Sequence, residues 1–192
     1  MKQAKNNNTR SLPGAIRAVE GEGNERKFQI SFSSEEPYER WFGPEILSHD
    51  AGAVDLTRLN DIGVVLFNHD TDKVIGRVLR AWVEGERGCA EIEFDEDEFS
   101  EMIRQKVAKG TLKGISVRYS VGCWEEVKAG NTSSNGRHKG PCSIAVKWKP
   151  LEVSVVSVPA DATVGVGREL ETEENNASFW EMQVTVNRNY LA

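Results

Sequence analysis

The stretch that decides the fold runs from Asp95 to Val121 and reads DEDEFSEMIRQKVAKGTLKGISVRYSV. Its first half predicts a helix over 96–109, because apolar residues recur at helical spacing and a glycine follows as a stop. Asp95 and Glu98 have the spacing of a capping box, which predicts Asp95 as the N-cap. The second half alternates apolar and polar residues over 115–121, as a half-buried strand does. The sequence therefore predicts a helix that leads directly into a strand.

Further short strands lie on both sides of this stretch. Their predicted ranges are 28–32, 64–67, 74–78, 89–94 and 151–158. Between 40 and 60 the pattern breaks into turns and one or two short helices, and 129–140 is a polar loop. Many short strands with one strong helix predict a mainly β fold with α (α+β), in which helices flank an antiparallel β-barrel or sheet. A doubly wound α/β fold is not expected.

Composition excludes several classes of protein. The chain has 192 residues, 39% hydrophobic and 28% charged, with a formal net charge of -6, which predicts a soluble globular protein. No apolar run could span a bilayer, and the basic, Asn-rich first dozen residues lack the apolar core of a secretion signal. Three cysteines without a CxxC pair favour neither a disulfide framework nor a zinc knuckle. Because the net charge is negative, binding along a DNA backbone is not expected either.

The ends of the chain differ in composition from its middle. We expect a flexible N-terminal arm over 1–24, a folded domain over 25–166 and a polar tail over 167–192. Within that tail, 182–186 predicts a weak terminal strand.

Three polar residues are candidates for chemistry. His69 follows the apolar strand 64–67 in a polar turn, Ser116 shares a strand face with Arg118, and Glu152 interrupts an apolar strand. Each also has a structural interpretation: a turn histidine, a serine on a solvated sheet face, and an edge charge that blocks aggregation. Together they could supply the base, nucleophile and orienting acid of Ser-His-acid hydrolysis. A serine hydroxyl needs this set because it reacts at neutral pH only when an imidazole takes its proton.

The order of these segments resembles the prohead (capsid maturation) proteases of tailed bacteriophages with HK97-type capsids, whose fold is similar to that of herpesvirus assembly proteases. Four segments carry the resemblance: SEEP and RWFG over 34–43, LFNHD and IGRV over 66–78, GTLKGISV over 110–117, and LEVSVVSVPA over 151–160.

The resemblance implies that His69 is the catalytic histidine, Ser116 the nucleophile and Glu152 the third member. His138 is the alternative third member, because herpesvirus proteases use a second histidine there. One departure is Arg118, where the family usually has glycine. This arginine could bind an oxyanion or a substrate carboxylate, or it could mark an impaired site.

The implied function is that of a serine endopeptidase that processes scaffold and capsid proteins, and finally itself, during phage procapsid maturation. The expected partners are the major capsid protein, the scaffold protein and the portal-containing procapsid, with self-association left open. The expected location is the host cytoplasm inside assembling procapsids, with no cofactor, metal, membrane or nucleic acid. One alternative is a catalytically inactive β-rich module that binds scaffold. Another is a metal-assisted hydrolase built on His49, Asp50, His69, Asp70 and Asp72.

Overall fold

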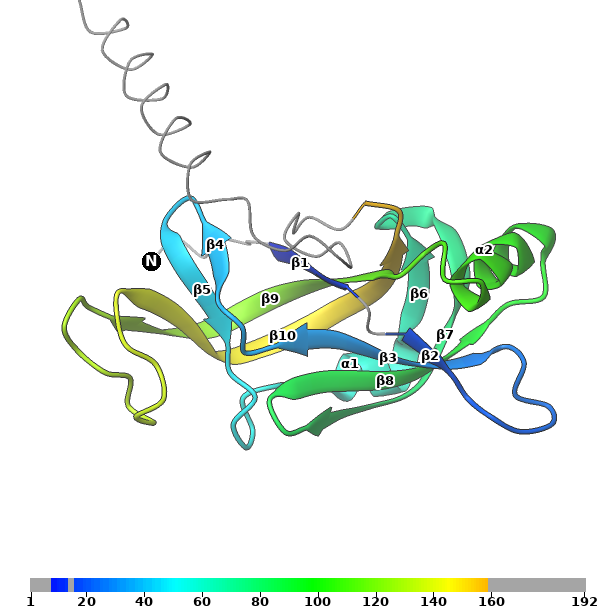
Figure 1. The fold of residues 1–192 in the computed structure, drawn as a ribbon. Coiled ribbons are helices and arrows are strands. Elements are labelled where there is room, and N and C mark those ends of the chain that lie inside the picture. Colours follow the sequence, from blue (N-terminus) through cyan, green and yellow to red (C-terminus); the bar gives the residue numbers. More distant parts are fainter. Residues whose placement is uncertain (1–7, 14–15, 159–192) are drawn as a thin grey trace, which may run out of the picture. The chain divides into compact units, whose positions relative to one another are not determined.

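The computed structural model describes residues 8–13 and 16–158, which belong to the first of two units, 1–162. Its elements are, in chain order, β1 (Asn8–Pro13), β2 (Ile16–Ala18), β3 (Lys27–Ser34), β4 (Tyr38–Arg40), β5 (Gly43–Leu47), α1 (Thr57–Ile62), β6 (Val64–Phe67), β7 (Asp70–Glu84), β8 (Arg87–Phe94), α2 (Glu98–Ala108), β9 (Gly114–Val127) and β10 (Cys142–Val156) (Figure 1). The polar tail 167–192 and its predicted strand at 182–186 lie outside the described residues.

The strands form one curled sheet in the order β1-β9-β10-β6-β7-β8-β3-β2, and β5 joins β4 to β10 (Figure 1). The mainly β architecture with few helices is thereby confirmed. The sheet is mixed and not purely antiparallel, because β10 runs parallel to both β5 and β6. Parallel neighbours require long connections, and β10 follows both strands only after many intervening residues. β10 is thus the strand that ties the early part of the chain to the late part.

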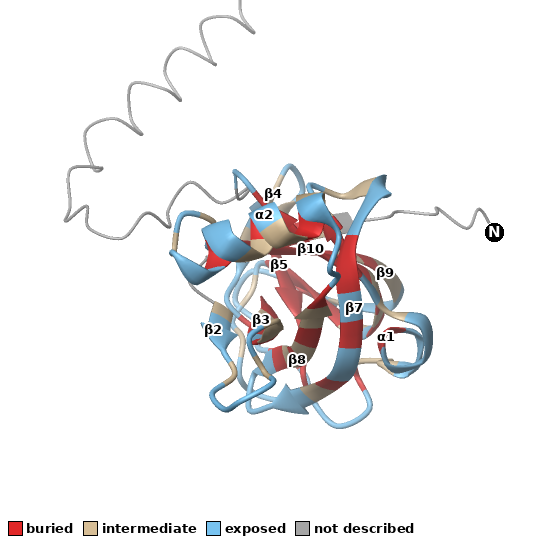
Figure 2. Cartoon of the chain, turned by 90° about the vertical axis from the view of Figure 1, so that its right-hand side faces the viewer, coloured by how far each residue is buried: buried red, intermediate tan, exposed pale blue. Residues whose placement is uncertain are grey.

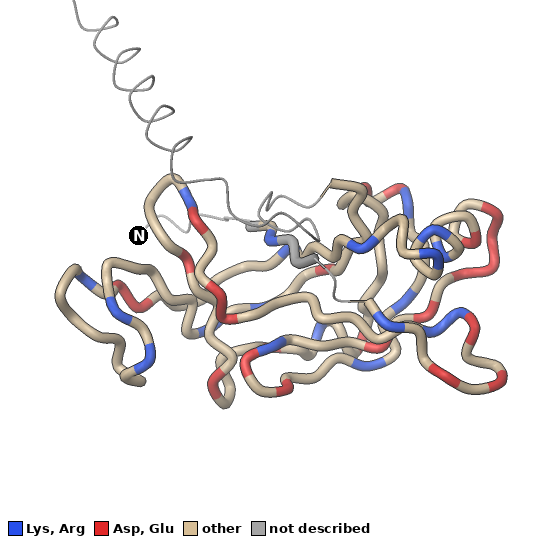
Figure 3. The backbone as a smooth tube through the Cα atoms, in the orientation of Figure 1, with Lys and Arg blue, Asp and Glu red and all other residues tan. Residues whose placement is uncertain are grey.

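The core lies on the concave side of the curled sheet. Strand alternation produces it, as in β8, where Gly88, Ala90, Ile92 and Phe94 are buried and their neighbours are not. Figure 2 shows the buried positions gathered on the inward strand faces. Charged residues of both signs are interspersed along the chain (Figure 3).

Helix α2 packs against β7 and β8 and buries Ile103 and Val107, on the apolar face that the sequence predicts. Its N-cap is Asp97, whose side chain accepts a 3.0 Å hydrogen bond from the amide of Ser100. The prediction of Asp95 as the cap was wrong by two residues. Four acidic residues in a row all suit a helix start, so only the backbone geometry selects the cap. No helix within residues 8–13 and 16–158 is long and apolar enough to cross a membrane.

Two regions contain strands that the sequence did not predict. Where turns and short helices were expected over 40–60, β5 extends to Leu47 and forms a hairpin with β4 before α1 begins. Residues 8–13 and 16–18, assigned to a flexible arm, form β1 and β2. β1 is an edge strand ordered by backbone pairing with β9, and such pairing needs no apolar alternation in the sequence.

Candidate active site

A two-residue turn between β6 and β7 presents His69. Phe67 and Asp70 pair across the turn, so Asn68 and His69 are its central residues, with φ of 54° and 60°. Positive φ at both positions is the geometry of a type I′ turn, whose twist matches the flanking strands. Glycine normally adopts it, and a histidine held there is strained in the way that functional residues often are.

Hydrogen bonds to the end of β10 hold this turn in place. The Asn68 amide donates to the carbonyl of Val155 at 2.9 Å. The Asn68 side-chain oxygen accepts from the amide and hydroxyl of Ser157, at 2.9 and 3.1 Å. The His69 amide donates to Ser154 Oγ at 3.2 Å. The turn is therefore fastened to the strand that carries Glu152.

The imidazole of His69 lies between Ser116 and Glu152. Nε2 is 2.7 Å from Ser116 Oγ, and Nδ1 is 2.5 Å from Glu152 Oε1. A neutral ring with its proton on Nδ1 donates to Glu152 and accepts from the serine hydroxyl, which is the arrangement of a serine hydrolase. The Ser116 residue is 1% exposed, whereas 20% of the His69 side chain remains exposed. The structure thus brings together all three residues that the sequence analysis selected.

Strands β9 and β10 place the serine and the acid on one face. They pair antiparallel, with Ser154 opposite Ser116 and Glu152 opposite Arg118. Cross-strand partners share a face, so these four side chains lie on the same side of the sheet. Val117 and Val153 form the pair between them and are both fully buried on the core side.

A bulge in β10 sets the direction of Glu152. Trp148 and Pro150 are buried opposite Val121 and Tyr119, but the pairing skips Leu151 and resumes at Glu152. The extra residue shifts the alternation by one position. Glu152 therefore lies on the face of His69 and not on the core face that Trp148 and Pro150 share, as bulges beside active sites commonly achieve.

The carboxylate of Glu152 is well satisfied although it is buried. Ser154 Oγ donates to its Oε2 at 2.9 Å, and Arg118 Nε lies 3.5 Å from its Oε1. Arg118 also donates from Nη2 to the backbone carbonyl of His69 at 3.2 Å. A buried carboxylate is costly without such partners. The arginine that departs from the family pattern thus contacts both the acid and the histidine turn.

His138, the alternative third member, lies beside a different acid. Its Nε2 is 3.4 Å from Glu35 Oε2, and its backbone amide donates to Ser133 Oγ at 3.0 Å. Nδ1 of His69, where a third member acts, is instead occupied by Glu152.

A second serine-histidine-acid cluster, formed by Ser33, His49 and Glu35, was not found from the sequence. Ser33 Oγ lies 2.7 Å from His49 Nε2, and Glu35 Oε1 accepts from the His49 amide at 2.6 Å. The His49 side chain is 0% exposed, and burial lowers the pKa of its ring to about 4. A ring closed off from substrate cannot act as its base, so this cluster is structural.

The two histidines of the metal alternative lie in different clusters. His49 contacts Ser33, whereas His69 lies between Ser116 and Glu152. Within residues 8–13 and 16–158, no group of three or more His, Cys, Asp or Glu residues is placed to hold a metal ion.

The β-rich fold and the Ser-His-Glu arrangement together define a serine-hydrolase-like site. The family model of the caudovirus prohead serine proteases matches residues 22–177, and the chain belongs to this family. The resemblance stated from the sequence is therefore confirmed.

Two individual proteins are also similar. The major capsid protein of Halomonas phage phiHAP-1 is 34% identical over 143 residues, which are 72% of this chain and 23% of that protein. The chain thus spans less than a quarter of that relative's length. The solved structure of the bacteriophage T4 capsid assembly protease gp21 has a TM-score of 0.46 and 15% identity, covering 80% of this chain and 100% of that one.

Proposed function

We propose that the chain is a serine endopeptidase of procapsid maturation, with Ser116 as nucleophile, His69 as base and Glu152 as orienting acid. The observation that carries the proposal is the continuous contact from Ser116 Oγ through the His69 ring to Glu152, at 2.7 and 2.5 Å. Membership of the prohead serine protease family supports the same chemistry.

The proposed mechanism follows from these contacts. Nε2 of His69 takes the hydroxyl proton as Ser116 Oγ attacks a peptide carbonyl, and the proton then passes to the leaving amine. Water then attacks the acyl-enzyme, with His69 again acting as base, and Ser116 is released. Glu152 holds the Nδ1–H tautomer and stabilises the imidazolium, while Arg118 keeps the acid and the turn in register.

The proposed substrates are the capsid protein, the scaffold protein and the protease itself, inside procapsids assembling in the host cytoplasm. The family name and the capsid-protein relative support this assignment. We assign the activity to a protease domain over 25–166. Confinement with the substrates would supply effective concentration in place of tight binding.

Co-expression with the capsid protein tests the proposal. Ser116→Ala should abolish processing without changing the melting temperature appreciably. Glu152→Gln should leave activity reduced by about 10⁴-fold, because the acid orients and does not attack. Ser33→Ala is the matched control, since it removes the other serine that contacts a histidine, and it should leave processing intact.

Two results would contradict the assignment. Undiminished cleavage by Ser116→Ala would exclude it as nucleophile. An active Glu152→Gln with a dead His138→Ala would make His138 the third member. Co-assembly with capsid protein and no Ser116-dependent cleavage would instead indicate a structural module that lost its chemistry.

A further inference from the structure

β1 covers the second edge of the strand that carries the proposed nucleophile. It pairs antiparallel with β9, with Ser11 opposite Ser116 and Arg10 opposite Val117. β10 occupies the other edge of β9, so β1 lies where an extended peptide could add to the sheet beside the active site. Adding a strand to an exposed edge is a common mode of peptide recognition, in which the backbone gives affinity and alternate side chains give specificity.

The backbone of Arg10 contacts the nucleophile itself. Ser116 Oγ donates a 3.0 Å hydrogen bond to the Arg10 carbonyl and also lies 2.7 Å from His69 Nε2. The hydroxyl has one proton and cannot donate to both groups. While the hydroxyl donates to the Arg10 carbonyl oxygen, it does not donate to Nε2 of His69, so the ring cannot take its proton. β1 in this position therefore opposes the proton transfer that the proposed mechanism needs.

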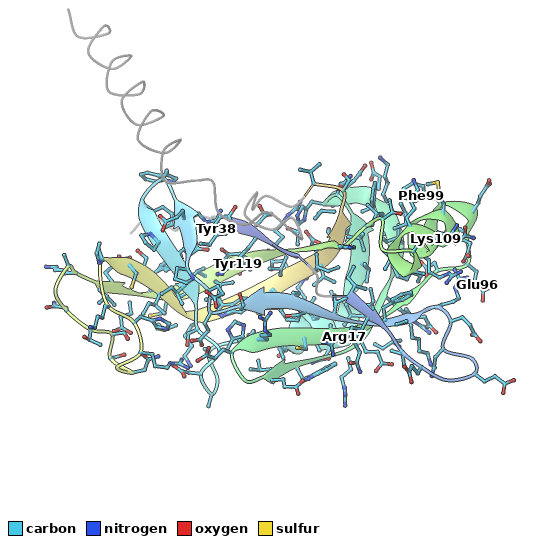
Figure 4. The ribbon with its side chains drawn as sticks, in the orientation of Figure 1. Arg17, Tyr38, Glu96, Phe99, Lys109 and Tyr119 are labelled. Atoms are coloured by element: carbon cyan, nitrogen blue, oxygen red, sulfur yellow. The ribbon has the colours of Figure 1, made fainter. Side chains whose placement is uncertain are left out.

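The side chain of Arg10 is buried beside an aromatic ring and near a buried acid. The residue is 2% exposed, and its Nη2 donates to the backbone carbonyl of Glu36. Its guanidinium carbon lies 5.7 Å from the ring centre of Tyr38, within the range of a cation–π contact. Burial lowers the pKa of Arg10, whereas Tyr119 and the fully buried Glu45 act in the opposite direction. Tyr38 and Tyr119 are labelled in Figure 4.

The charge of this site stays compensated when Arg10 leaves. Glu45 accepts hydrogen bonds from the Tyr119 hydroxyl and from Arg40, whose Nη2 is 3.2 Å away. Among the described residues, Nε and Nη1 of Arg10 have no hydrogen-bond partner. The guanidinium of Arg10 is thus only partly hydrogen-bonded, and the Arg40 guanidinium already compensates the charge of Glu45. Both facts favour exchange of one basic side chain for another.

We propose that the substrate binds along the edge of β9 and at the site around Glu45. The selected substrate is an extended peptide with Arg or Lys at the position of Arg10. β1 is then an intramolecular competitor for this position. The proposal rests on the proposed function. Ser116 Oγ would bond to the carbonyl carbon of the basic residue, and the C–N bond to the next residue would break. The proton held by His69 would leave with the new amine. Water would then release the new carboxylate and restore the serine.

Competition of this kind depends on substrate concentration. A tethered strand acts at an effective concentration on the order of mM, so dilute substrates compete poorly with β1. Substrates packed beside the enzyme reach comparable concentrations. Pairing of β1 with β9 would therefore inhibit the enzyme in dilute solution, and the crowded substrates inside a particle would relieve this inhibition.

The test uses the 192-residue chain and quenched fluorescent peptides with the sequence of residues 6–15. The position of Arg10 is Arg, Lys, Ala or Glu in the four peptides, and mass spectrometry locates the cut. The Arg and Lys peptides should be cut after the basic residue with kcat/KM about tenfold or more above the Ala and Glu peptides. Arg10→Ala in the enzyme should raise the rate on the Arg peptide several-fold and should increase amide exchange along β9.

Glu45→Gln should reduce the preference for Arg over Ala toward unity, whereas Glu39→Gln, an exposed acid on the same hairpin, should not. If Glu45→Gln fails to fold, Tyr38→Leu removes the ring beside the guanidinium and should weaken the same preference. Ser116-dependent cleavage without a basic preference, or with the same rate in Arg10→Ala and the unmodified chain, would overturn this inference and leave the proposed function standing. Absence of Ser116-dependent cleavage in every variant would overturn both.

Discussion

Acidification from pH 8 to pH 5 should destabilise the folded protein through His49. Burial lowers the pKa of this ring from 6.5 to about 4 in the folded chain. Below pH 6.5 the unfolded chain takes up a proton at this position and the folded chain does not. The stability that the neutral ring contributes is therefore present above pH 6.5 and is lost as the pH falls toward 4. Linkage puts the loss at about 2 kcal/mol by pH 5 and about 3 kcal/mol by pH 4.

Urea unfolding followed by tryptophan fluorescence measures this loss. Trp148 is a suitable reporter because its ring packs edge-to-face on His49 at 5.6 Å. Other ionisable groups also contribute to the pH dependence, so a His49→Gln variant in identical buffers subtracts their contribution. The free-energy difference between the two proteins should shrink by about 2 kcal/mol from pH 8 to pH 5. A difference that stays constant with pH would refute the argument that burial suppresses protonation here.

Three further changes test other parts of the structure. Gly76→Ala should lower the free energy of unfolding by about 2 kcal/mol or more, because a Cβ would lie 2.2 Å from a backbone oxygen of β8. A Cβ at Gly122 would have no atom nearer than 3.6 Å, so Gly122→Ala should lower the free energy of unfolding far less. Equal melting temperatures of the two variants would contradict this reasoning. Asp97→Ala should cost about 1 kcal/mol in urea unfolding through loss of the helix cap; no change would argue against its capping role. Arg118→Ala should reduce kcat/KM about tenfold with little effect on folding, whereas an increase would show that this arginine impairs the site.

The residues of the candidate site could be selected from the sequence because each stands at a simple position in a strand pattern. Alternation places Ser116 and Arg118 on one face, and the end of an apolar strand places His69 in a turn. The resemblance to the prohead proteases then implied a catalytic role for each residue. What the sequence could not show is that the turn has positive φ at both central residues, because neither Asn68 nor His69 is the glycine that normally signals it.

Features that depend on long-range pairing were missed. Arg10 lies in an Asn-rich segment without periodicity, and only its pairing with β9 brings it to Ser116, over a hundred positions away. Ser33 and His49 meet through the return of the chain along β5, which was expected to be turns and helix. The parallel pairings of β10 with β5 and β6 have no local signal in the sequence either. Local patterns fix which face a residue occupies, but register and strand neighbours are decided by the whole sheet.

The bulge at Leu151 links the number of residues in this part of β10 to the position of the proposed orienting acid, Glu152. β10 takes four steps from Trp148 to Glu152, whereas β9 takes three from Val121 to Arg118, and the bulge absorbs the difference. With the same four-step spacing and no bulge, simple alternation would put Glu152 on the core face of Trp148. A carboxylate there would lie in the apolar interior, which is costly, and His69 would lose its partner. An acid beside His69 therefore requires either the bulge or a segment that is shorter by one residue.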